Sequence, residues 1–186
     1  MSPTSFPRVA VVCAATLIAC DTSPSRDPTA PSSTRPEPDA TTATPGPAAT
    51  GDAHILIFNG TTPERFEFSA VVTGAGLVAG EFQLFTEQAG GISIQGPVTC
   101  LGISGNLARI GGVITESSLP AFVGRPVLWE VVDNGEGVNA RPDQTSDFAA
   151  VQSPDVVATF CATGSGSLPF PLQLMDVLRG NIQVFP

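Results

Sequence analysis

The sequence contains no lysine and no tyrosine, and it has one histidine and one tryptophan. All eight of its basic residues are arginines, against 17 acidic residues, so the formal net charge is −9. This acidic balance argues against nucleic acid as a partner, because the phosphate backbone attracts basic surfaces. It argues equally against electrostatic attraction to anionic lipid.

The scarcity of histidine weighs against nucleophilic catalysis, which needs a base held beside the nucleophile. The one histidine, His54, stands where an N-terminal segment meets the body of the chain, and we expect that position to be mobile. Carboxylates for a glycosidase-like pair are present at Glu130, Asp133, Glu136 and Asp143. Sugar sites commonly stack aromatic rings, however, and the body has only one tryptophan. We therefore expect a protein that is not an enzyme.

The apolar run near the start, residues 9–19, is too short to cross a bilayer core, which needs roughly 20 residues in a helix. A short polar start with Arg8 precedes it and small residues end it, which is typical of a secretory signal. The sequence LIAC at 17–20 resembles the lipobox of bacterial lipoproteins. That resemblance implies cleavage before Cys20 and acylation of this cysteine; the alternative is an ordinary signal peptide with a chance cysteine.

Two or more acyl chains give stable anchoring, because each buried methylene contributes about 0.8 kcal/mol. We therefore expect an extracytoplasmic protein of the bacterial cell envelope, anchored through Cys20 in a membrane whose identity stays open. Residues 21–52 are rich in Pro, Thr, Ser and Ala and contain no aromatic residue, so they should form a disordered tether. The predicted organisation is a signal peptide over 1–19, the lipidated cysteine and tether over 20–52, and one β domain over 53–186.

Two cysteines remain in the body, Cys100 and Cys161, each within an apolar run. Because the expected compartment permits oxidation, we predict a disulfide between them, with two buried free thiols as the alternative. A loop of this length would contribute about 4 kcal/mol of stability in the chain-entropy model.

The body shows the period-two pattern of strands, as in ERFEFSAVV, where Phe66, Phe68 and Ala70 share one face. About eight such runs, separated by turn signals, indicate an all-β antiparallel meander. Glycines inside the strands favour a closed or nearly closed barrel, with a two-sheet β-sandwich as the alternative. One short helical candidate lies at 171–179. The predicted strands are 54–58, 64–72, 76–86, 92–103, 107–115, 125–133, 155–160 and 180–185.

Three motifs resemble a group of uncharacterised secreted bacterial β-domains: VTCL with GNLARIGG, the loop sequence DNGEG, and a closing GNIQV. The resemblance spans most of residues 66–185. It implies an all-β extracytoplasmic domain and implies no activity.

The loop within residues 130–150 gathers four carboxylates: Asp133, Glu136, Asp143 and Asp147. Calcium prefers several such oxygen ligands at once, but their spacing does not match an EF-hand. Asp133-Asn134-Gly135 is also a good tight-turn sequence. A structural loop is therefore the favoured interpretation, with a calcium site as the alternative and no other cofactor expected.

Two functions remain open. The first is a tethered, non-enzymatic structural or binding module of the envelope, with a protein or glycan partner. The second is a lipocalin-like barrel that carries a small hydrophobic ligand. The residues expected to line such a cavity, unless they form a plain core, are Phe66, Phe68, Phe82, Leu84, Trp129 and Phe160.

Overall fold

The computed structural model describes residues 46–87, 90–164, 168 and 171–186. The predicted signal peptide, the lipidation site Cys20 and most of the predicted tether lie outside the described residues. The fold below is that of the β domain alone.

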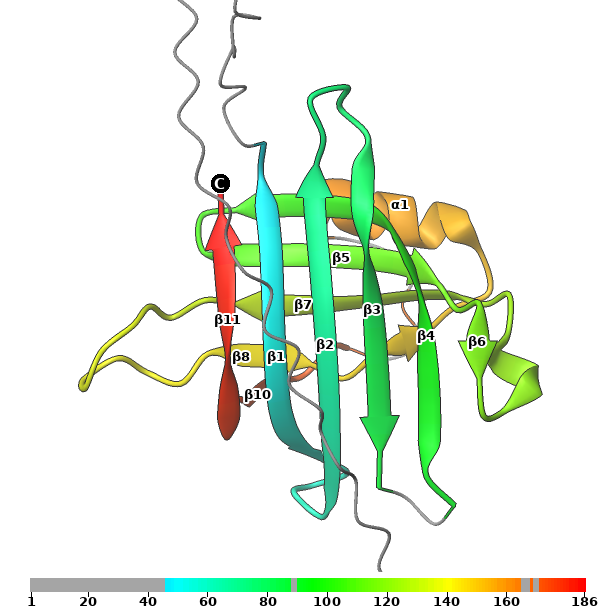
Figure 1. Ribbon diagram of the computed structural model, residues 1–186, viewed down its shortest axis with the longest axis horizontal. Coiled ribbons are helices and arrows are strands. Elements are labelled where there is room, and N and C mark those ends of the chain that lie inside the picture. The colour runs from blue at the N-terminus through cyan, green and yellow to red at the C-terminus, as the bar shows by residue number, and fades with distance from the viewer. Residues whose placement is uncertain (1–45, 88–89, 165–167, 169–170) are drawn as a thin grey trace, which may run out of the picture. The chain divides into compact units, whose positions relative to one another are not determined.

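One antiparallel sheet of 11 strands forms the domain, which confirms the predicted all-β meander (Figure 1). The sheet order is β10-β8-β7-β5-β4-β3-β2-β1-β11, with β6 paired to β4 and β9 to β7. The strands are β1 Ala48–Ile57, β2 Thr62–Val72, β3 Val78–Thr86, β4 Ile92–Ser104, β5 Leu107–Val113, β6 Glu116–Ser117, β7 Pro126–Val132, β8 Gln144–Ser146, β9 Ala149–Ala150, β10 Leu174–Asp176 and β11 Arg179–Phe185. A 3-10 turn, η1, spans Pro120–Phe122.

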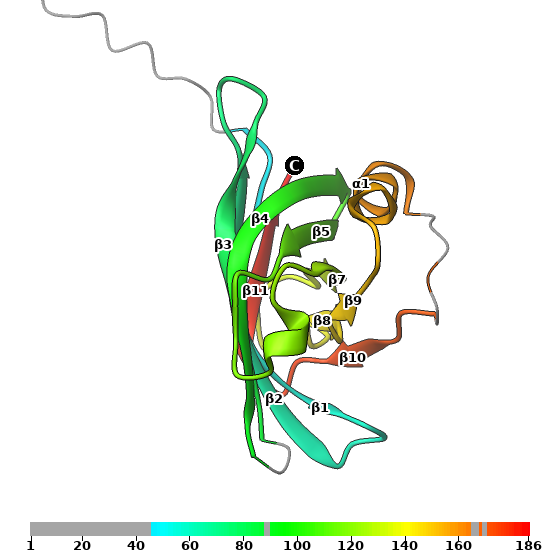
Figure 2. The ribbon, with the colours of Figure 1, turned by 90° about the vertical axis from the view of Figure 1, so that its right-hand side faces the viewer.

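Strand β4 carries the sheet from one layer into the other. Its first half pairs with β3 and its second half with β5, and the register with β5 shifts between Val98 and Cys100. A Cβ atom on Gly96 would lie 1.9 Å from the Val113 carbonyl oxygen, so this crossing needs glycine. The strands of the two layers cross at a steep angle, and the sheet curls into a half-barrel (Figures 1 and 2). The half-barrel is open rather than closed, because β10 and β11 end the strand order without pairing with each other.

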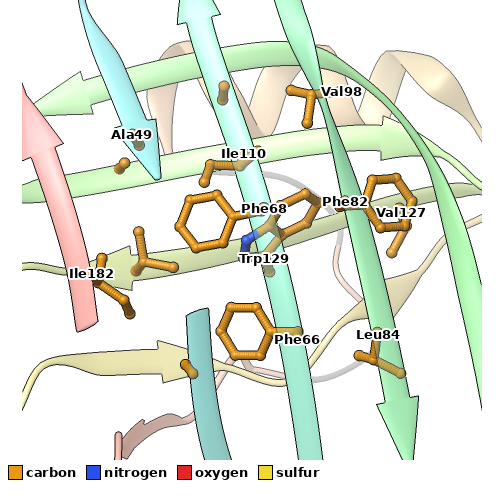
Figure 3. Close-up of a cluster of buried hydrophobic side chains, with 14 of the residues drawn as sticks. Ala49, Phe66, Phe68, Phe82, Leu84, Val98, Ile110, Val127, Trp129 and Ile182 are labelled. Carbon is orange, nitrogen blue, oxygen red and sulfur yellow. The ribbon is translucent and has the colours of Figure 1, made fainter. Parts of the chain in front are cut away.

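The space between the layers is filled by a cluster of aromatic side chains (Figure 3). The half-buried Phe148 packs against this cluster: its ring stacks on Trp129 with centroids 4.3 Å apart and lies 5.6 Å from the rings of Phe66 and Phe82. Phe68 meets Trp129 edge to face at 6.0 Å. Five of the six residues proposed to line a ligand cavity belong to this core, and Phe160 belongs to a second buried cluster. Their packing gives the ligand-carrier hypothesis no support.

The α-helix α1, Pro154–Thr163, covers the outer side of the second layer (Figure 2). The predicted strand at 155–160 is therefore wrong. Ser153 caps the helix by accepting a hydrogen bond from the Asp155 N–H, Pro154 begins it, and Gly164 ends it in the left-handed conformation. Within the described residues, no helix has the length and apolar character needed to span a bilayer.

The disulfide between Cys100 and Cys161 is present and ties α1 to β4. The close approach of the helix depends on two glycines of the sheet. A Cβ atom on Gly102 would lie 1.8 Å from the Cys161 carbonyl oxygen, and one on Gly111 would lie 2.1 Å from the Val157 Cγ1 atom.

Two other boundaries differ from prediction. Strand β1 begins at Ala48 rather than His54, so the last residues assigned to the tether are paired in the sheet. The helical candidate at 171–179 is wrong, because β10 occupies part of that segment and pairs with β8.

Candidate functional site

An open groove of about 970 Å³ lies on the outer face of the first layer, the face toward the viewer in Figure 1. The side chains that point outward from β1, β2, β3, β4 and β11 form it in cross-strand rows. One row is Gln183, Thr50, Ser69, Glu81 and Pro97, and the next is Asn181, Asp52, Glu67, Gln83 and Gln95.

The groove lining combines polar and apolar surface and carries net negative charge. Its amides and hydroxyls both donate and accept hydrogen bonds, and three carboxylates, Asp52, Glu67 and Glu81, accept them. Arg65, two residues before Glu67 on β2, forms ion pairs with Asp52 and Glu67, and its single positive charge offsets one of the three negative charges. Chemically, this surface can bind a ligand with many hydroxyl groups.

Two carboxylates of the predicted calcium loop accept hydrogen bonds from backbone N–H groups of the loop itself and of β11. The Asp143 carboxylate, which is buried, accepts the N–H of Asn134 at 2.8 Å and that of Ile182 at 2.9 Å. The Asp133 carboxylate accepts the N–H of Gly135 at 2.8 Å and that of Val184 at 3.0 Å. Ile182 and Val184 belong to β11, so these two carboxylates fasten the loop to the edge of the sheet.

The other two predicted calcium ligands lie apart from this arrangement. Glu136 is exposed at the tip of the loop. Asp147 accepts the Phe148 N–H and faces Glu64 of β2. Across the residues that the structure describes, no group of three or more His, Cys, Asp or Glu side chains is arranged to hold a metal ion. Calcium binding by this loop stays a prediction.

Glu64 and Asp147 form a hydrogen-bonded acid pair that sequence reasoning missed. Glu64 is 2% exposed, and its Oε1 atom has no hydrogen-bond partner. Burial, reinforced by the charge of Asp147 and by their hydrogen bond, raises the pKa of Glu64 from 4.5 to about 9. Burial also raises the pKa of Asp147, while hydrogen bonds from Phe148 and Glu64 oppose that rise. At neutral pH the pair therefore holds a proton on Glu64.

The remaining candidates for catalysis, His54 and Glu130, lie on β1 and β7. His54 lies within β1 instead of at a junction and has Arg65 and Arg179 as its cross-strand partners. Glu130 is half-buried; burial raises its pKa and the neighbouring Arg109 lowers it.

Compared with known protein families, with curated proteins and with solved structures, the chain shows no significant match.

Proposed function

We propose that the protein is a lipid-anchored module of the bacterial cell envelope that binds a glycan without catalysis, and that the outer groove is the binding surface. The observation that carries the proposal is the chemistry of the groove lining. Its amide and hydroxyl side chains match sugar hydroxyls, which both donate and accept hydrogen bonds. An apolar ligand would leave these polar groups unpaired, at a cost in affinity.

A glycan site also benefits from an aromatic face, and Phe85 offers one. This residue follows Gln83 by two positions on β3, on the same outward face, and its side chain is 46% exposed. A ring at the border of the groove can cover the apolar face of a sugar while Gln83 binds its hydroxyls.

Retention of the full-length chain on immobilised xylan, dextran, chitin and peptidoglycan tests the proposal. We expect at least one polymer to retain the chain, and Gln83→Ala and Phe85→Ala to reduce that retention roughly tenfold, since each loses direct contacts. Gln152→Ala is the matched control, because Gln152 is exposed outside the groove. Retention by none of the polymers, or equal retention of the groove variants and the wild type, would contradict the proposal.

A further inference from the structure

A row of basic side chains borders the groove on the same outer face. Arg179, His54 and Arg65 are direct cross-strand partners on β11, β1 and β2. Two residues along a strand correspond to roughly 7 Å, so this basic row lies about that distance from the groove row that contains Asp52 and Glu67.

The two arginines of this row differ in their partners, and His54 separates them. Arg65 already forms ion pairs with Asp52 and Glu67. Arg179 is exposed and forms no ion pair within the described part of the chain. Its guanidinium group is therefore available to an external anion, beside the imidazole of His54.

We infer that Arg179 and His54, with Arg65 beside them, bind a carboxylate group of the glycan that occupies the groove. The inference rests on the proposed function and specifies its ligand as an acidic glycan. The planar guanidinium group of arginine matches a carboxylate with two parallel hydrogen bonds. Asp52 and Glu67 would repel a doubly charged phosphate monoester more strongly than a singly charged carboxylate, so the carboxylate fits better.

Polygalacturonate and its methyl ester test this inference, because esterification removes the charge of each carboxyl group and adds only a methyl group. The full-length chain should bind polygalacturonate about tenfold more tightly than the ester, which is the effect expected of one charge-assisted hydrogen-bonded pair. Arg179→Gln should abolish this preference while keeping binding to the ester, and Arg179→Lys should retain part of it. Added salt should weaken the preference, because the site is exposed.

Arg141→Gln is the matched control, because Arg141 is exposed in the acidic loop outside the groove and the substitution removes the same charge. Equal binding of both polymers by the wild type would overturn the acidic subsite and leave the glycan-binding proposal intact. A preference that persists in Arg179→Gln would also overturn it. Binding of neither polymer would overturn the subsite, and retention on neutral dextran or xylan in the same assay would then show whether the groove binds glycans at all.

Discussion

The buried proton shared by Glu64 and Asp147 couples stability to pH. Glu64 follows the alternation of β2 and faces the interior together with Phe66 and Phe68. An ionised carboxylate at this position would be desolvated beside the charge of Asp147, so the native state holds the proton. The unfolded chain releases that proton near pH 4.5, its ordinary value.

Stability should consequently fall as pH rises from about 4.5 to about 9, the window set by the two pKa values of Glu64. Within the window the native state binds one proton more than the unfolded state, which corresponds to at most about 1.4 kcal/mol per pH unit. Glu64→Gln should remove most of this slope, because the amide still donates a hydrogen bond to Asp147 but does not ionise. Urea denaturation between pH 6 and 9 measures both slopes.

Glu116→Gln serves as the control for that series, because Glu116 is exposed and the change is chemically the same. Its slope should match that of the wild type. If the free energy of unfolding of Glu64→Gln declined with pH as steeply as that of the wild type, the shared proton would not be the cause.

At the scale of elements, the loop within residues 130–150 covers part of an exposed sheet edge. Strand β11 pairs with β1 on one side only, and an unpaired edge invites association with other strands. The carboxylates of Asp133 and Asp143 occupy two N–H groups of that edge, those of Val184 and Ile182. Side chains thus replace the backbone pairing that a closed barrel would supply.

Asp143→Ala should therefore lower the free energy of unfolding by about 2 kcal/mol, because it leaves the buried Ile182 N–H without an acceptor. Asp143→Asn should cost less, since one oxygen remains to accept. Glu136→Ala, at the exposed tip of the loop, should change stability by less than about 0.5 kcal/mol. Chemical denaturation at neutral pH compares the three variants, and equal losses for Asp143→Ala and Glu136→Ala would refute the role of Asp143 at the edge.

The same series with millimolar calcium separates the two roles of the loop. A calcium site would stabilise the wild type by mass action and leave Asp143→Ala unaffected by calcium. If the loop has a purely structural role, the free energies of unfolding of the wild type and Asp143→Ala should differ by the same amount with and without calcium.

The sequence predicted the long strands well because their alternation is local. In β2 every second side chain is buried, as the pattern of Phe66, Phe68 and Ala70 indicated. Strand β1 was predicted too short because its interior positions Ala49, Gly51 and Ala53 are small and resemble tether composition. The segment of helix α1 was predicted as a strand because a short apolar run fits both the two-residue period of a strand and the 3.6-residue period of a helix. Ser153-Pro154 and Gly164 were usable cap signals for a helix.

The sites were harder to predict, for a physical reason. The groove exists only through the register of five strands, which local sequence does not specify. The acid pair joins residues far apart in the chain, yet Glu64 carried a signal: it is a charged residue in phase with the buried face of β2.

At the scale of the whole chain, the proposed function requires the β domain to be held at a membrane. The expected attachment point is Cys20, and residues 21–47 lie between it and β1. Acyl chains on this cysteine would supply the membrane affinity, since the acidic composition offers none to anionic lipid. Anchoring and glycan binding should then be separable properties, carried by different parts of the chain.

Cys20→Ala should move the protein from the membrane fraction to the soluble fraction without changing its retention on a glycan column. Cys13→Ala is a matched control: the substitution is chemically the same, but Cys13 lies within the expected signal peptide and its loss should leave anchoring intact. Intact-mass spectrometry of the membrane-extracted wild type should find a chain that begins at Cys20 and carries the added mass of acyl groups. A wild-type chain without that mass, or a Cys20→Ala variant that stays in the membrane fraction, would mean that attachment depends on something other than a lipidated cysteine.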